Sequence, residues 1–288
     1  MRFQSNRMDP QRYGVGQIKF LVVLIPLAIL FGLPLLYIVT TAFKPIEELF
    51  AFPPRFFVKQ PTLDNFRDMV DAMEESSIPF SRYLMNSILS TLAVVIATIL
   101  ITLSAGYTLA KKEFKGKELL NTINTMSMMF VPVAVTIPRY LVINALGVTN
   151  TIFALILPLI AMPVGLFLMV QSIKDIPDEL INAARIDGAN EWMVLTKVIV
   201  PLVKPTTATV AILSFQSAWN AIEPSSYFIS DDTLRTFPYY VSALAAANNI
   251  AGAGMAAAAT LVLLIPSLIL FVIMQNKVMN TMAHSGIK

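Results

Sequence analysis

Long apolar segments constrain this chain more than any other feature. The apolar residues come in blocks of about 20, the length at which an α-helix crosses the hydrocarbon core of a bilayer, and not at the 3.6-residue spacing of a soluble amphipathic helix. Of the 288 residues, 56% are hydrophobic and only 14% are charged, whereas soluble domains have about 25% charged residues. The sequence therefore predicts an all-α integral membrane protein.

Six segments have this length and composition. They are 18–43, 83–110, 119–146, 151–171, 198–220 and 256–275. The first is too long for the core of a signal peptide and has no persuasive cleavage site, so we expect an uncleaved anchor. The predicted organisation is an N-terminal segment, 1–17, followed by one domain of six transmembrane helices, 18–288.

Lysine and arginine gather on one side of this six-span arrangement. They occupy the N-terminal segment, the connections after the second and fourth spans, and the C-terminal tail: Arg2, Arg7, Arg12, Lys19, Lys111, Lys112, Lys115, Lys117, Lys174, Arg185, Lys197, Lys277 and Lys288. By the positive-inside rule this side is cytoplasmic, with both termini inside. Because the charges flank apolar segments and form no single basic face, we expect no nucleic-acid partner.

The opposite side carries two long loops. The loop 44–82 is broken by five prolines, and the segment 221–254 carries Glu223, Asp231 and Asp232 against Arg235. Loops of this length can fold into caps that receive a partner protein. They can equally be solvated connectors, and the residues alone leave both interpretations open.

Several function classes fit poorly. The chain has no cysteine and one histidine, His284, in its tail, which leaves no thiol chemistry and little other catalytic chemistry for a membrane enzyme. The central turns of the spans contain no Asp or Glu, which disfavours an ion-coupled secondary transporter. We therefore predict no catalytic residue, no metal site and no cofactor in this chain.

The loop 173–205, between the fourth and fifth spans, is polar yet patterned like a folded element. Pro177 suits the start of a helix, and the carboxylates that follow it complement the positive end of the helix dipole. Gly188 offers a left-handed stop. We predict a helix of about three turns, 177–187, and a second helical piece, 190–200, that leads to Pro201 and Pro205.

At these residues the chain resembles the permease subunits of bacterial ATP-binding-cassette (ABC) importers, whose hallmark is an EAA motif followed by Asp-Gly-Ala. The matching residues are Ala183, Ala184, Asp187, Gly188, Ala189, Ile199, Pro201 and Pro205. Asn182 stands where the family has glutamate, so no carboxylate role is carried over to it, although an amide still donates and accepts hydrogen bonds. An ordinary amphipathic loop helix is the alternative.

The resemblance implies a type I ABC importer permease fold in which the short helix is the coupling helix that docks on a separate ATPase. The residues it assigns to coupling are Glu179, Asn182, Ala183, Ala184, Arg185, Asp187 and Gly188. The implied partners are a sister permease, two ATPase subunits, an external solute-binding protein and membrane lipid. ATP and Mg²⁺ belong on the ATPase, because Glu118 follows Gly116-Lys117 where a phosphate-binding loop needs Ser or Thr.

Further segments resemble the carbohydrate branch of these permeases, the MalG-like subunits. They are TAFKPIEELFAFPPRFF from Thr41, PTLDNF from Pro61, NSILST from Asn86, AGYTLAKKEFKGK from Ala105, LGVTNTIFALILP from Leu146 and HSGIK from His284. The resemblance implies sugar or oligosaccharide uptake by alternating access. Glycerol phosphate and amino acids remain alternative cargoes within the superfamily.

Polar positions inside the spans are candidates for lining a translocation pathway, since polar groups in hydrocarbon are costly unless they face inward. They are Asn86, Tyr107, Arg139, Gln216, Trp219 and Asn220. Each can instead bond between helices. Trp219 can stack on a sugar or anchor at the interface. Arg139 can extend to the outer headgroups or face the cavity, where it would favour an acidic sugar.

Overall fold

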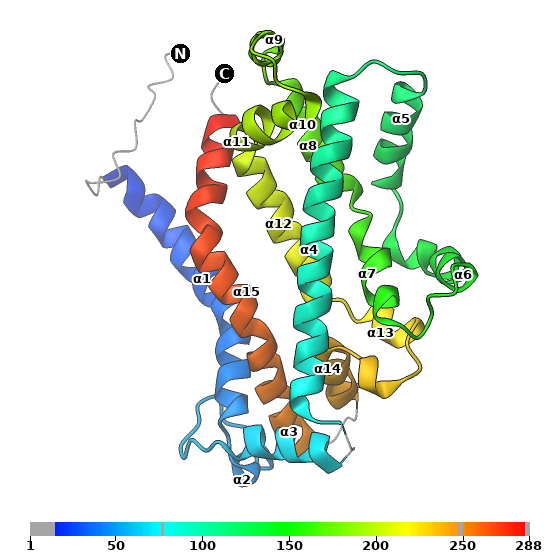
Figure 1. Cartoon of the computed structure of the whole chain (residues 1–288). Helices are drawn as coiled ribbons and strands as arrows, with labels where there is room; N and C mark the ends of the chain where they lie inside the picture. Colours follow the sequence, from blue (N-terminus) through cyan, green and yellow to red (C-terminus); the bar gives the residue numbers. More distant parts are fainter. Residues whose placement is uncertain (1–14, 76–77, 247–249, 286–288) are drawn as a thin grey trace. The chain divides into compact units, whose positions relative to one another are not determined.

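The computed structural model describes residues 15–75, 78–246 and 250–285, and every regular element in those ranges is a helix (Figure 1). The chain divides into two compact units. One comprises Met1–Met69 and Asn248–Leu261, and the other comprises Val70–Ala247 and Val262–Lys288. Each unit is described by itself.

The first unit contains α1 (Val15–Ala42), α2 (Ile46–Leu49), the beginning of α3 (Asp64–Glu75) and the beginning of α15 (Ile250–Ser285). The most apolar stretch of α1 has no buried residue within this chain, as expected of a helix whose surroundings are lipid or another subunit. Asn65 fixes the turn after α1, because its amide donates to the carbonyls of Ala42 and Lys44 at 3.0 and 2.7 Å.

The second unit is built around α4 (Phe80–Lys111), which packs against α7 (Ile152–Ile160), α8 (Pro163–Lys174), α12 (Lys204–Trp219) and α14 (Phe237–Ala246). Gly106 allows α4 to approach α8 closely. A Cβ on Gly106 would lie 2.8 Å from Cγ of Met169, so only glycine fits at this crossing.

Six candidate spans are present among the described residues, but only three are single helices. Phe20–Ala42, Phe80–Lys111 and Gly252–Met274 are each long and apolar enough to cross a membrane. The other three candidates are pairs of helices separated by a bend. The prediction of six spans agrees with this number, and three of the six are each built from two helices.

The third span shows the sharpest break. α5 (Lys117–Ser127) is followed by a 3-10 turn, Pro132–Val135, and by α6 (Thr136–Ala145), with a bend of 116° where the sequence predicted a helix over 119–146. Val131 is extended, with φ −74° and ψ 130°. This conformation follows from Pro132, because proline disfavours an α-helical residue before it and supplies no N–H.

The fourth and fifth spans are also broken before proline. α7 and α8 meet at 45° where Met162 leaves the helical region ahead of Pro163. Glu191–Leu202 and the helix that starts at Lys204 meet at 82°, two residues before Pro205, whose missing N–H leaves the carbonyl of Pro201 without its helical donor.

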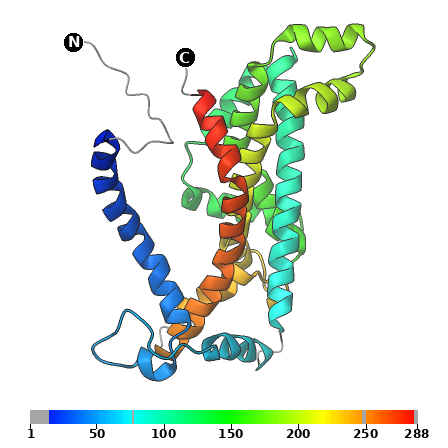
Figure 2. The ribbon, with the colours of Figure 1, turned by 90° about the vertical axis from the view of Figure 1, so that its left-hand side faces the viewer.

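The two ends of α4 meet different elements. At its Lys111 end lie α9 (Asp178–Ile186), α10 (Glu191–Met193), a π-helical stretch, Val194–Ile199, and α11 (Val200–Leu202) (Figures 1 and 2). At its Phe80 end lie α13 (Glu223–Tyr227), the 3-10 turn Asp232–Leu234 and α14 (Figure 1). The candidate site lies at the Lys111 end.

Candidate functional site: the loop around α9

The short helix predicted between the fourth and fifth spans is present as α9. It has nine residues, about two and a half turns, and Pro177 precedes it as the N-cap instead of lying in its first turn. Gly188 ends the helix with φ +84°. The amides of Gly188 and Ala189 donate to the carbonyls of Arg185 and Ala184 at 3.0 and 2.9 Å, the bond pair of a Schellman turn.

One face of α9 is buried against the rest of the second unit. Ile181 is 3% exposed and belongs to an apolar cluster with Ile173, Ile176, Val194 and Ile199, and Ala184 packs on the same cluster. Residues that recur three or four positions apart share one helix face, so Ile181 and Ala184 fix which side of α9 faces inward.

The opposite face of α9 is free. Of the residues assigned to coupling, all but Ala184 are exposed: Glu179, Asn182, Ala183, Arg185, Asp187 and Gly188. Ile186 on this face is 86% exposed, and Trp192 beyond the turn is 68% exposed. Large apolar side chains held in water on a rigid element indicate a surface that another protein covers.

Asn182, which departs from the family motif, takes part in a local contact. Its Oδ1 accepts from the Arg185 guanidinium at 3.5 Å, and the same guanidinium donates to Oε1 of Glu191 at 3.1 Å. The amide therefore helps to hold Arg185 between the helix and the following turn, without supplying a charge.

Glu191 joins this loop to the end of α4. The Tyr107 hydroxyl donates to its Oε2 at 2.6 Å, and the Lys112 ammonium lies 2.6 Å from its Oε1. Hydrogen bonds from Lys112 and Tyr107, together with the positive charge of Lys112 and Arg185, lower the pKa of the Glu191 carboxyl to about 2. We call Tyr107, Lys111, Lys112, Asp178, Arg185 and Glu191 the Glu191 cluster.

Lys111 holds the other side of the loop. Its ammonium donates to the carbonyl of Ile176 and to Oδ1 of Asp178, the latter at 2.7 Å, and its side chain is only 9% exposed. One cation thus binds a carbonyl two residues before α9 and the carboxylate of the first residue of α9. The two ends of the loop are both fixed to consecutive lysines of α4 and its C-cap.

Sequence reasoning missed most of this cluster. It assigned Tyr107 to a translocation pathway, whereas the structure buries Tyr107 against α9 and α10. It used Lys111 and Lys112 only as topology signals and did not single out Glu191. A usable signal was Asn190, whose side chain accepts from the amide of Met193 at 2.8 Å, because such an N-cap places the next residue, Glu191, at a helix start.

Asn86 lies at the other end of α4 and is also committed to structure. Its amide donates to the carbonyls of Thr233 and Arg235 at 2.8 and 3.0 Å, and the residue is 4% exposed. Ser87 accepts from the amide of Phe237 at 2.8 Å, and Arg82 donates to the carbonyl of Thr233. We call Arg82, Asn86 and Ser87 the Asn86 cluster. It holds the loop before α14 and leaves no free amide for a sugar.

Trp219 is buried as well. It is 3% exposed, stacks on Phe215 with ring centroids 5.8 Å apart, and donates through Nε1 to the carbonyl of Leu263 at 2.8 Å. Neither predicted role, stacking on a sugar or anchoring at the interface, fits an indole whose ring and N–H are both enclosed by its own chain.

Arg139 has a partner that the sequence did not reveal. Its guanidinium donates to Oε1 of Glu223 at 2.8 Å, and both side chains are about three-quarters covered. The pair joins α6 to α13 across 84 positions of sequence. The structure thus adds an ion pair inside the chain, and the two predicted alternatives for the exposed part of Arg139, headgroups or the cavity, stay predictions.

Gln216 and Asn220 are the pathway candidates that stay exposed. Gln216 is in the last turn of α12 and Asn220 is the C-cap residue, whose amide donates to the carbonyl of Gln216 at 2.9 Å. Their assignment to a translocation pathway remains a prediction.

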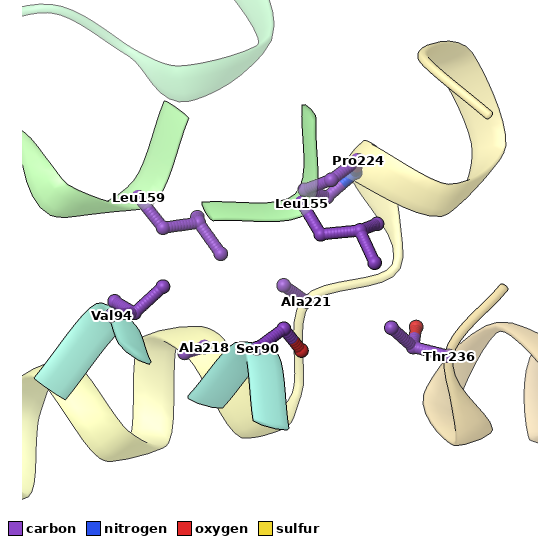
Figure 3. A pocket seen from close by; sticks show the side chains of 8 residues that line it. All are labelled: Ser90, Val94, Leu155, Leu159, Ala218, Ala221, Pro224 and Thr236. Carbon is purple, nitrogen blue, oxygen red and sulfur yellow. The ribbon is translucent and has the colours of Figure 1, made fainter. Parts of the chain in front are cut away.

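A small cavity lies near these residues, between α4, α7 and the end of α12. It measures about 10 Å³, and Ser90, Ala221 and Thr236 are among the side chains at its wall (Figure 3). This is room for about one water molecule, so no sugar is held in this cavity.

The fold and the loop together define a class: an all-helical polytopic membrane protein with a short, exposed helix between its fourth and fifth spans. Residues 99–278 match the family described as "Binding-protein-dependent transport system inner membrane component". This match covers more than half of the chain, and the protein belongs to that family.

Curated relatives agree with this assignment. A sulfoquinovosyl glycerol transport system permease of Agrobacterium fabrum is 32% identical over 257 residues, with 88% of each chain covered. The trehalose/maltose transport system permease MalG of Thermococcus litoralis is 27% identical, with 94% of this chain and 97% of that one covered. The likeness extends over nearly the full length of each protein.

Solved structures show the same fold. A chain of a bacterial ABC transporter involved in the import of the acidic polysaccharide alginate matches with a TM-score of 0.79 at 20% identity, covering 92% of this chain and 98% of that one. The alginate transporter in complex with an alginate pentasaccharide-bound periplasmic protein matches with a TM-score of 0.59 at 16% identity. The protein has the type I ABC importer permease fold.

Proposed function

We propose that this protein is the permease subunit of an ABC importer that moves a sugar or oligosaccharide across the cytoplasmic membrane. The observation that carries the proposal is α9, a helix held by Ile181 and the Glu191 cluster with its other face free. Carbohydrate cargo is supported by relatives named for the transport of sulfoquinovosyl glycerol, trehalose/maltose and arabinooligosaccharides.

The proposed assembly contains a sister permease, two ATPase subunits and an external solute-binding protein. The solved relative with a bound periplasmic protein supports the last of these. A second permease is supported by the extensive uncovered apolar surface of α1. The side of the membrane that bears the basic turn 111–117, α9 and both termini is proposed to be cytoplasmic, by the positive-inside rule.

In the proposed mechanism, closure of the ATPase pair on ATP displaces α9. Since Lys111 and Lys112 bind both ends of the loop, the displacement of α9 is passed to α4 through these contacts. Rocking of the two permeases then alternates access to a pathway between them. ATP and loaded binding protein shift the population toward the outward-open state only as far as each binds that state better.

The docking part of this proposal is tested on the free face of α9. Ala183→Arg places a long cation on the exposed side and leaves the buried contacts of Ile181 intact, whereas Ala184→Arg would also disturb the core. We expect Ala183→Arg to abolish uptake and to release the ATPase during co-purification. Glu118→Arg, an exposed position in the first turn of α5, is the matched control.

Membrane insertion of each variant is checked by its yield in the washed membrane fraction. Normal ATPase recovery with normal uptake in Ala183→Arg would refute docking through α9. The cargo is tested separately, by uptake into proteoliposomes that contain the whole transporter and its binding protein. Transport of an amino acid or glycerol phosphate, with no transport of any glycan, would refute carbohydrate cargo and leave the docking result unaffected.

A further inference from the structure

A groove of about 610 Å³ runs between α4, α5 and the break that separates α7 from α8. Residues 101–109 form one wall, residues 120–127 form the opposite wall, and residues 160–166 form the floor. The volume is in the range of sites that take small molecules, about 300–1,000 Å³. The groove does not contain any residue of α9 or of the Glu191 cluster.

The walls of the groove present hydrocarbon although several polar residues line it. Thr102, Ser104, Thr108 and Ser127 each donate to the carbonyl four residues earlier on their own helix, at 2.7 to 2.9 Å. The Asn124 amide donates to the carbonyl of Pro163 at 3.2 Å. With these hydroxyls and the amide already bonded, a sugar would find few partners here, whereas an apolar chain needs none.

Apolar side chains along α5 are left without cover. Leu120 and Ile123 point into the groove, yet they are 48% and 50% exposed. Covering such surface is favourable in proportion to its apolar area. An occupant that fills the groove would bury both side chains at once.

The groove has the depth of one membrane leaflet. Residues 101–109 of α4 rise by about 12 Å at 1.5 Å per residue, close to half of a hydrocarbon core about 30 Å thick. Phe114 lies at the groove's end, in the basic turn. The next residue in the sequence, Lys115, is exposed and makes no hydrogen bond or ion pair with the described part of the chain, whereas Lys117 is paired with Glu113 at 2.7 Å.

We propose that this groove binds an acyl chain of an anionic glycerophospholipid whose headgroup phosphate pairs with Lys115. The hydrocarbon walls select the tail, and the free ammonium at the groove's end selects a negative headgroup over a zwitterionic one. An ammonium near the membrane surface strengthens binding of an anionic lipid by about fivefold. Only the assignment of the groove to the inner leaflet rests on the proposed orientation.

The test uses the assembled transporter in nanodiscs made of equal parts phosphatidylglycerol and phosphatidylcholine. After transfer to detergent, native mass spectrometry counts the lipids that stay bound. We expect the wild type to retain phosphatidylglycerol preferentially. Lys115→Gln should lower that preference about fivefold, and Ser104→Trp, which fills the groove, should abolish retention. The matched controls are Lys174→Gln, another exposed basic position, and Ile96→Trp on the exposed surface of α4.

A photo-crosslinking amino acid in place of Leu120 identifies the occupant directly in the assembled transporter. An adduct with lipid supports the proposal, and an adduct with the sister permease would overturn it. Equal retention of the two lipids, or unchanged retention in Ser104→Trp, would also overturn it. Lipid retention is measured without transport, so a failure of the carbohydrate proposal leaves these results interpretable.

Discussion

The two ends of α4 are fixed to their neighbouring loops by different chemistry. At the Phe80 end, the Asn86 cluster binds backbone groups of the loop before α14, mostly through buried neutral side chains. At the Lys111 end, the Glu191 cluster binds the loop around α9 through ion pairs that are partly exposed to water. Buried neutral bonds are costly to break, whereas exposed ion pairs contribute little and can be exchanged.

This difference in chemistry fits the different roles of the two ends of α4 in the proposed importer. The loop before α14 keeps one position relative to α4. The loop around α9 receives force from a partner, and a cluster of several donors on one carboxylate tolerates small displacements without losing every contact. The comparison leads to four predictions, from the largest expected effect to the smallest.

Asn86→Leu should have the largest effect on stability. The change keeps the side-chain volume but leaves the partly buried carbonyl of Arg235 without this donor, at about 1–3 kcal/mol for an unsatisfied group, while the carbonyl of Thr233 keeps the bond from Arg82. We expect the unfolding midpoint in detergent to fall by several degrees. Asn220→Leu, an exposed amide bonded to its own helix, should shift the midpoint little. Equal midpoints for the two variants would contradict the assignment.

Glu191→Gln should leave the unfolding midpoint nearly unchanged and weaken coupling. The carboxylate is 54% exposed, so losing its charge costs only about 1 kcal/mol, and the weaker link between α9 and α4 should lower the amount of substrate transported per ATP hydrolysed. Glu118→Gln is the matched control outside the loop. Unchanged stoichiometry in Glu191→Gln would show that the cluster does not transmit force.

High ionic strength should weaken the contacts at the Lys111 end of α4 and not those at the Phe80 end, without any substitution. Raising the ionic strength from about 0.1 M to 1 M shortens the Debye length from about 10 Å to 3 Å, which weakens exposed ion pairs but not buried neutral bonds. We expect faster amide hydrogen exchange in 176–191 and no change in 230–237. Equal acceleration in both segments would mean that the two clusters do not differ in kind.

Mild acid should have the smallest effect. The pKa of Glu191 is lowered from 4.5 to about 2, so its stabilising contribution is fully present above pH 4.5 and is lost only as the pH falls toward 2. Hydrogen exchange in 176–191, corrected for the intrinsic pH dependence, should therefore be equal at about pH 7 and about pH 5. Markedly faster corrected exchange at about pH 5 would mean that the lysine and tyrosine contacts do not lower the pKa of the Glu191 carboxyl.

The sequence was sufficient for the features that depend on local chemistry. The length of the apolar blocks predicted six spans. Pro177 and Gly188 predicted α9 to within one residue at each end, because a helix cap or a left-handed C-terminal residue depends on the type of a single residue. Proline alone does not say where a span bends, because α1 and α15 keep prolines inside one helix whereas bends occur before Pro132, Pro163 and Pro205.

Contacts between residues that are far apart in the sequence could not be predicted from local patterns. Tyr107 and Glu191 are 84 positions apart, as are Arg139 and Glu223, and no periodicity joins them. Polarity within a span correctly indicated that Asn86 faces away from lipid, but it could not distinguish a backbone partner from a substrate. Trp219 shows the same limit, since its partner carbonyl belongs to Leu263.

The lysines that close α4 place an unusual constraint on how this chain can vary. Charge that only biases insertion can move a few positions along a turn without harm, because the bias depends on how many cations lie near the span. Lys111 and Lys112 cannot move in that way, because one binds Ile176 and Asp178 and the other binds Glu191. These two lysines should therefore accept few substitutions over evolutionary time, while Lys174 should drift in position as long as the total charge is kept.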